Sequence, residues 1–201
     1  MLGNLNDFNN SKDRVDFTGY DLQIHNEVSI LKKEYFNAMD NYDFSRAIKL
    51  LNNYIVDLSG FYLDYTKDFL YADKRNSSRR RMVQSNIYDI ALFYIKALAP
   101  FIPASMEDAY KSFGGSKESI HLELFNKNVE RNIDKDSYKE FYELKDKIFK
   151  AIEVARNNDV IKRSFEAHIQ IPKIYDFSKE ELQKMFMIGK VTFGKDIKVF
   201  K

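Results

Sequence analysis

The 201-residue sequence contains no cysteine, only three histidines, and few glycines and prolines (7 and 3). Without cysteine the chain has no disulfide, no thiol nucleophile and no thiolate metal site, which fits a reducing compartment. The histidines, His25, His121 and His168, are scattered and predict no zinc site. No apolar run approaches the roughly 20 residues of a membrane-spanning helix, and the N-terminus has no signal-peptide pattern. We therefore expect a soluble, cytoplasmic protein with no membrane partner.

Positive and negative charges nearly balance: the chain has 32 lysines and arginines and 30 aspartates and glutamates, for a net charge of +2. This balance excludes a histone-like polycation but leaves room for a local basic patch. Apolar residues make up 44% and aromatic residues 15% of the chain, more than a disordered protein carries. The length suits one full core with a small appendage.

The sequence predicts a mainly α fold, because breaks in helical periodicity coincide with the few glycines and prolines. The expected helices cover about 21–39, 78–98, 104–113, 136–157 and 178–188, together with one of roughly 27 residues that begins after an N-cap at Asp43. Gly60 lies inside this long helix and predicts a bend or a close helix contact. Short strands are expected at 119–124, 191–193 and 197–200.

These patterns divide the chain into three parts. Residues 1–20 are a polar lead-in segment, residues 21–160 form a helical bundle, and residues 161–201 form a small α/β segment that we expect to be truncated. In that last part we expect Phe186, Met187 and Phe200 to be exposed for lack of partners.

No motif in the chain predicts an active site. Residues 189–196 fit the GxxxxGK spacing of a phosphate-binding loop, but Asp196 stands where a serine or threonine is needed and no helix follows. We interpret this segment as a strand, a turn and a strand. No serine lies in a nucleophile-elbow motif. We therefore expect no catalytic residue, no metal site and no cofactor in this chain.

A basic cluster is more informative. It places five positive side chains within eight residues at a helix start: Lys74, Arg75, Arg79, Arg80 and Arg81. Positive charge there opposes the helix dipole, so the cluster is either a solvated loop or a set of phosphate contacts. A second group flanks the helix that ends near residue 157: Arg156, Lys162 and Arg163. Tyr62, Tyr65 and Tyr71 are candidates for base stacking, although most of them fall at core spacing.

Several stretches together resemble one known family, in its order and at compatible spacing. They are Leu2–Phe8, Asp40–Ala47, Asp57–Asp64 with Lys67 and Asp68, Ser78–Arg81, Leu98–Pro103, Ser119–Leu122, Ala155–Ile161 and Ser164–Ala167. The chain is similar to the anticodon-binding helical domain of bacterial isoleucyl-tRNA synthetases, which are class I enzymes, and the resemblance covers nearly the whole chain.

The resemblance implies a domain of a larger synthetase that joins isoleucine to its tRNA with ATP and magnesium. The catalytic HIGH and KMSKS signatures, the editing domain and the cysteine-ligated zinc module of the family have no counterpart here. We therefore expect the chain to be an inactive fragment, a monomer whose partners are the isoleucine tRNA and the remaining domains. The family's Asp-Arg-Trp helix start is replaced around Ile24, His25 and Asn26.

The RNA-binding residues that we predict are Lys74, Arg75, Arg79, Arg80 and Arg81, with Arg156 and Lys162 as second choice. Two alternatives stay open: the corresponding domain of a valyl- or methionyl-type synthetase, and a helical protein–protein interaction module. Neutralising Arg79, Arg80 and Arg81 separates RNA binding from the latter. If the cluster binds RNA, we expect binding to be lost with the fold intact.

Overall fold

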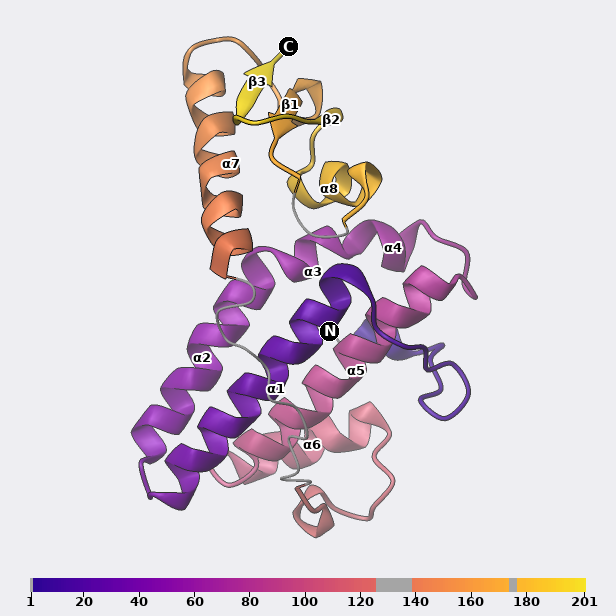
Figure 1. The fold of residues 1–201 in the computed structure, drawn as a ribbon. Coiled ribbons are helices and arrows are strands. Elements are labelled where there is room, and N and C mark those ends of the chain that lie inside the picture. The colour runs from indigo at the N-terminus through magenta and orange to yellow at the C-terminus, as the bar shows by residue number, and fades with distance from the viewer. Residues whose placement is uncertain (1, 126–138, 174–176) are drawn as a thin grey trace. The chain divides into compact units, whose positions relative to one another are not determined.

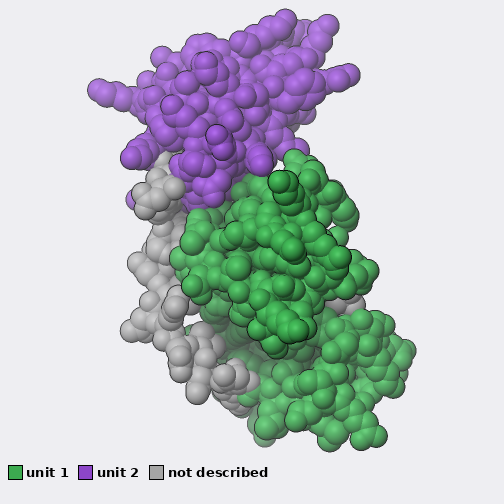
Figure 2. Space-filling model, turned by 90° about the vertical axis from the view of Figure 1, so that its right-hand side faces the viewer, with its two compact units in different colours: residues 1–133 green, residues 134–201 purple. Residues whose placement is uncertain are grey.

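The computed structural model describes residues 2–125, 139–173 and 177–201, and it is mainly helical, as the sequence predicts (Figure 1). The chain divides into two compact units, residues 1–133 and residues 134–201 (Figure 2). The sequence predicts this boundary near residue 160 instead. The difference arises because helix α7 (Lys139–Asn157) packs on a strand of the second unit. The expected start of this helix, residues 136–138, lies outside the described residues.

Unit 1 is a bundle of antiparallel and crossing helices. Its described elements are η1 (Leu2–Leu5), α1 (Gly19–Asp40), α2 (Phe44–Gly60), α3 (Tyr62–Tyr65), α4 (Lys67–Tyr71), α5 (Ser78–Leu98), α6 (Pro103–Phe113) and η2 (Ile120–Leu122). Helix α1 packs against α2 and α5, and α5 also contacts η1, α4 and α6. The lead-in segment is therefore attached to the bundle through η1.

The core of unit 1 includes one face of α1, whose apolar residues recur at helical spacing. Ile24, Val28, Leu31 and Tyr35 are all buried, and the last two share one cluster with apolar side chains of α2 and α5. The hydroxyl of Tyr35 donates to the Ala97 carbonyl oxygen of α5 at 2.8 Å. This bond satisfies a polar group that burial would otherwise penalise.

The expected long helix after Asp43 is broken into α2, α3 and α4. Asp43 caps α2 as predicted, since its carboxylate accepts from the backbone N–H of Arg46 at 3.1 Å. The helix ends at Gly60, and the next residue, Phe61, has a non-helical φ of −136°. The predicted bend is thus a full break, after which Tyr62 and Tyr65 are buried.

The prediction of a strand at residues 119–124 was wrong, because Ile120–Leu122 form the 3-10 helix η2. The Glu107 carboxylate accepts from the Ser119 hydroxyl at 2.9 Å and from the Ile120 backbone N–H at 3.0 Å. The Ser119 hydroxyl oxygen in turn accepts from the N–H of His121. These side-chain acceptors use the donors that a sheet would need.

Unit 2 combines helices with a small sheet. Its described elements are α7, η4 (Ser164–Glu166), β1 (His168–Ile171), α8 (Lys179–Phe186), β2 (Lys190–Phe193) and β3 (Lys198–Phe200). The strand order is β2-β1-β3, with β1 parallel to β2 and antiparallel to β3. Ile169 pairs with Val191 on one side and with Val199 on the other. Residues 190–200 are a strand, a turn and a strand, which confirms our interpretation of the GxxxxGK spacing.

The side chains of unit 2 correct one expectation. Phe186 is buried at 2% exposure, whereas Met187 and Phe200 are exposed as expected. Phe186 is buried because it ends the apolar face of α8, where its ring packs edge-on against Phe149 of α7 at 5.6 Å. Unit 2 thus has a small apolar core of its own.

Candidate nucleic-acid interface

The predicted basic cluster occupies the loop after α4 and the first turn of α5. Ser77 caps α5, since its hydroxyl oxygen accepts from the backbone N–H of Arg80 at 3.1 Å. The cap places Arg79, Arg80 and Arg81 in one helical turn, which sends their side chains in different directions. Their side chains are only 21%, 13% and 9% exposed. Each of the three therefore makes its contacts mainly within the protein.

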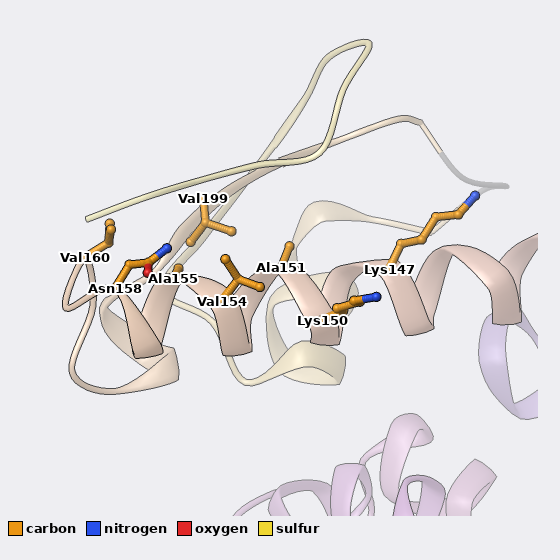
Figure 3. A pocket seen from close by; sticks show the side chains of 8 residues that line it. All are labelled: Lys147, Lys150, Ala151, Val154, Ala155, Asn158, Val160 and Val199. Atoms are coloured by element: carbon orange, nitrogen blue, oxygen red, sulfur yellow. The ribbon is translucent and has the colours of Figure 1, made fainter.

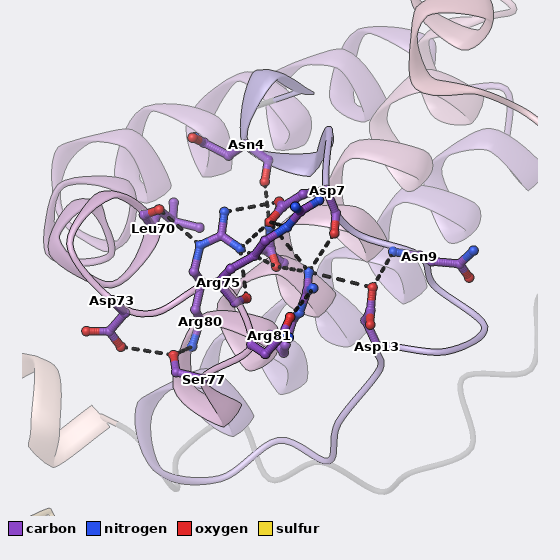
Figure 4. Close-up of polar contacts among 12 residues, drawn as sticks. Asn4, Asp7, Asn9, Asp13, Leu70, Asp73, Arg75, Ser77, Arg80 and Arg81 are labelled. Atoms are coloured by element: carbon purple, nitrogen blue, oxygen red, sulfur yellow. Dashed lines mark hydrogen bonds and ion pairs between the residues drawn. The ribbon is translucent and has the colours of Figure 1, made fainter.

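Two of these arginines are held by Asp7, which follows η1 (Figure 4). Arg80 donates to the Asp7 carboxylate through both terminal guanidinium nitrogens, at 2.7 and 3.0 Å. Arg81 donates to the Asp7 backbone carbonyl oxygen at 2.8 Å and lies 3.6 Å from the carboxylate of Asp13. The amide of Gln84 also donates to Asp7, at 2.8 Å. We call Asp7, Arg80, Arg81 and Gln84 the Asp7 cluster.

The Asp7 cluster fixes the charge of its central carboxylate. The hydrogen bonds from Arg80 hold the pKa of Asp7 well below its usual value of 3.8, against the opposing effect of partial burial. Asp7 is therefore ionised at neutral pH, and the lead-in segment is tied to α5 by charge-assisted bonds.

Arg79 belongs to a separate, more deeply buried cluster. It forms an ion pair with Asp21 of α1, whose side chain is fully buried. The hydroxyl of Tyr62 donates to the same carboxylate at 2.6 Å, and Arg79 donates to the hydroxyl oxygen of Tyr65 at 2.8 Å. The guanidinium carbon lies 4.6 Å from the ring centre of Phe69. Burial, and then the Asp21 charge, raise the pKa of Tyr62 well above its usual value.

The exposed part of the cluster lies in the loop before α5. Arg75 is 72% exposed and makes a single bond to Asp7, at 3.1 Å from its Nε. Lys74 is exposed and has no side-chain partner among the described residues. Tyr71, at the end of α4, is 73% exposed. These residues form what we call the 71–75 loop, which presents two cations and one aromatic ring to solvent.

The three tyrosines that we considered for base stacking differ sharply in exposure. Tyr62 and Tyr65 are core residues at 1% and 4% exposure, so their rings have no free face. Of these three tyrosines, Tyr71 alone has an exposed ring that a base can reach. The RNA-binding role of the predicted arginines and lysines stays a prediction.

The second predicted group lies in unit 2, and its charged side chains are exposed. Arg156 is near the end of α7 and donates to the hydroxyl oxygen of Ser164 at 2.6 Å. Lys162 is exposed in the following loop. The guanidinium of Arg163 lies 5.8 Å from the ring centre of Phe165. All three side chains therefore lie at the end of α7 or in the loop that follows it.

Unit 2 also contains an open groove of about 450 Å³ between α7 and β3 (Figure 3). Apolar side chains such as Val154, Val160 and Val199 line it, with Lys147 and Lys150 toward one end. None of the predicted RNA-binding residues lines this groove. Its apolar lining does not suit a phosphate backbone.

The carboxylates that hold the basic cluster, Asp7 and Asp21, were not predicted from the sequence. Asp7 lies 73 residues from Arg80, and charge alone gave no reason to pair them. One signal in the sequence is a group of polar residues close together in helix 78–98: Arg81, Gln84, Ser85 and Asn86. The structure buries all four of them. Polar residues on a helix face that should be apolar indicate internal partners.

The described residues show neither a membrane span nor a metal-binding cluster. In the part of the chain that the structure describes, no helix is both long and apolar enough to cross a membrane. The same residues contain no grouping of three histidine, cysteine, aspartate or glutamate side chains placed to hold a metal ion.

Comparison with known proteins identifies the domain. Residues 21–171 match the family described as the anticodon-binding domain of tRNA ligase. The isoleucine–tRNA ligases of Mycoplasmopsis pulmonis, Mycoplasma mobile and Mycoplasmopsis agalactiae are 40%, 37% and 41% identical to the chain. Each alignment covers 99% of the chain but 23% of the relative. With more than half of its length inside the family match, the chain belongs to the anticodon-binding domains of tRNA ligases.

Proposed function

We propose that this chain binds the anticodon stem-loop of an isoleucine tRNA, as one domain of an isoleucine–tRNA ligase. The observation that carries the proposal is the identity of 37–41% to three such ligases over 99% of the chain. The proposal includes a cytoplasmic location and a monomeric chain. It assigns the use of ATP and magnesium to the rest of the ligase, with no cofactor in this domain.

The 71–75 loop is the surface that we assign to the RNA in unit 1. Lys74 and Arg75 carry exposed charge suited to phosphates, and the exposed ring of Tyr71 is available to stack on an unpaired base. In this proposal Arg79, Arg80 and Arg81 support the loop indirectly, through contacts within the protein. Their bonds to Asp21 and Asp7 fix the start of α5, and with it the end of the loop. Arg156 and Lys162 remain second-choice contacts in unit 2.

The test is a titration of a labelled isoleucine anticodon stem-loop with the wild-type chain and with the double variant Lys74→Met/Arg75→Met. We expect the double variant to bind more weakly and to show a smaller salt dependence. The slope of log K against log salt concentration should fall by about 0.7–0.9 for each phosphate that the variant no longer neutralises.

A matched control removes the same charge elsewhere. Lys33 on α1 and Lys117 after α6 are both exposed, and Lys33→Met/Lys117→Met should bind like the wild type. Equal losses in the two double variants would reduce the effect to net charge and contradict our assignment of the 71–75 loop.

A further inference from the structure

The turn between α1 and α2 holds a tyrosine in an unfavourable backbone conformation. Tyr42 has a φ of +57°. The backbone N–H of Asp43 donates to the Ala38 carbonyl oxygen at 2.8 Å, and that of Tyr42 donates to Met39 at 3.0 Å. This is the position after a helix where glycine or asparagine is usual. Tyr42 is also 81% exposed, so burial of its ring does not offset the strain.

Tyr42 is part of a larger exposed apolar surface. The ring centre of Phe44 lies 6.2 Å from those of Tyr42 and Phe101. Phe44 is 46% exposed, and Ile102, which follows Phe101, is 45% exposed. We call Tyr42, Phe44, Phe101 and Ile102 the aromatic tip. It joins the α1–α2 turn to the α5–α6 turn, at the end of α1 remote from the 71–75 loop (Figure 1).

The charges beside the aromatic tip favour a protein partner over RNA. Asp40 and Asp43 are exposed on the turn itself, and Arg46 and Lys49 are exposed on the first turns of α2. A phosphate backbone is bound by an excess of cations, whereas this rim carries both signs in equal number. An aromatic centre within a polar rim of mixed sign is typical of protein interfaces.

We propose that the aromatic tip is the docking surface of this domain for an apolar face of another folded part of the same ligase. This inference rests on the proposed function, because it requires that the chain is one domain of a larger protein. The match leaves more than three-quarters of each relative outside the aligned segment, and this remainder supplies the folded parts on which the domain would dock. Docking explains why a strained, exposed tyrosine is present at residue 42.

The test separates folding from docking with one substitution, Tyr42→Asn. Asparagine tolerates positive φ, so the isolated variant should unfold at the wild-type temperature or up to about 3 °C higher. The docking partner is the largest piece of the Mycoplasmopsis pulmonis ligase outside its aligned segment, purified separately. We expect the labelled wild-type chain to bind this piece and Tyr42→Asn to bind about tenfold more weakly or worse.

The control is Val56→Gln, which changes a 68% exposed side chain roughly three turns further along α2 and should leave docking unchanged. Absence of wild-type binding, equal binding by Tyr42→Asn, or a fall in its unfolding temperature would each overturn the docking proposal. Loss of anticodon stem-loop binding in Tyr42→Asn would also overturn it, in favour of an RNA contact. If the wild-type chain binds the ligase piece but no stem-loop, the proposed function fails while the docking surface stands.

Discussion

The Asp21–Arg79 pair gives the sharpest prediction about stability. The Asp21 side chain is fully buried, and that of Arg79 is 21% exposed. Substitution Arg79→Met keeps an apolar stem against Phe69 but leaves the carboxylate without its cation. Removing one partner of a buried ion pair typically costs 3–5 kcal/mol. Because Tyr62 still donates to Asp21 at 2.6 Å, we expect the lower end, about 3 kcal/mol of unfolding free energy.

The assay is hydrogen exchange of the backbone amides of α1 and α5, which reports the opening of unit 1 alone. Arg75→Met is the matched control, because it removes the same group from a side chain that is 72% exposed and should cost less than about 1 kcal/mol. In Arg79→Met combined with Asp21→Asn, the cost should be smaller than the sum of the two single substitutions. A loss below about 1 kcal/mol in Arg79→Met, no larger than in the control, would refute a structural role for this pair.

Three further substitutions test other parts of the two units. Asp7→Asn should lower the free energy of unfolding by about 2 kcal/mol at pH 7. Because folding lowers the pKa of Asp7 from 3.8, the stability that the carboxylate contributes is complete above pH 3.8 and is lost as the pH falls below it. The free energies of unfolding of variant and wild type, measured in urea, should therefore become equal only in acid. Gly60→Ala should stabilise unit 1 by up to about 1 kcal/mol, because an added Cβ meets nothing within 4 Å. Gly189→Ala should strongly destabilise unit 2, because its Cβ would lie 2.3 Å from the Phe165 carbonyl oxygen. If calorimetry shows that both substitutions raise the unfolding temperature, or that both lower it, this prediction is contradicted.

Local signals in the sequence were sufficient for most of the fold. The N-cap at Asp43 was predicted, and helices α5 and α6 have bounds within one residue of the expected ranges 78–98 and 104–113. Each of these signals depends on a few neighbouring residues, and so periodicity and cap chemistry identify it. The strand expected at 119–124 was wrong because Glu107, on another element, accepts its donors. A contact between distant segments has no local pattern.

The same limit applies to the candidate site. The sequence showed five cations in eight residues but not which of them face inward. Only the fold shows that Arg80 meets Asp7 and that Arg79 meets Asp21. Neutralising Arg79, Arg80 and Arg81 is therefore no longer expected to leave the fold intact. Weaker RNA binding in such a variant would not separate unfolding from the removal of a direct RNA contact, and Lys74 and Arg75 make the cleaner test.

The most direct test of anticodon recognition compares two RNAs on the unmodified chain. The isoleucine anticodon stem-loop and a stem-loop with altered anticodon bases are titrated with the chain at two salt concentrations. We predict salt-sensitive binding of the first RNA and markedly weaker binding of the second, because unpaired bases are read by their edges and by stacking. Equal binding of both stem-loops, or binding of neither at low salt, would contradict the proposal that this domain reads the anticodon.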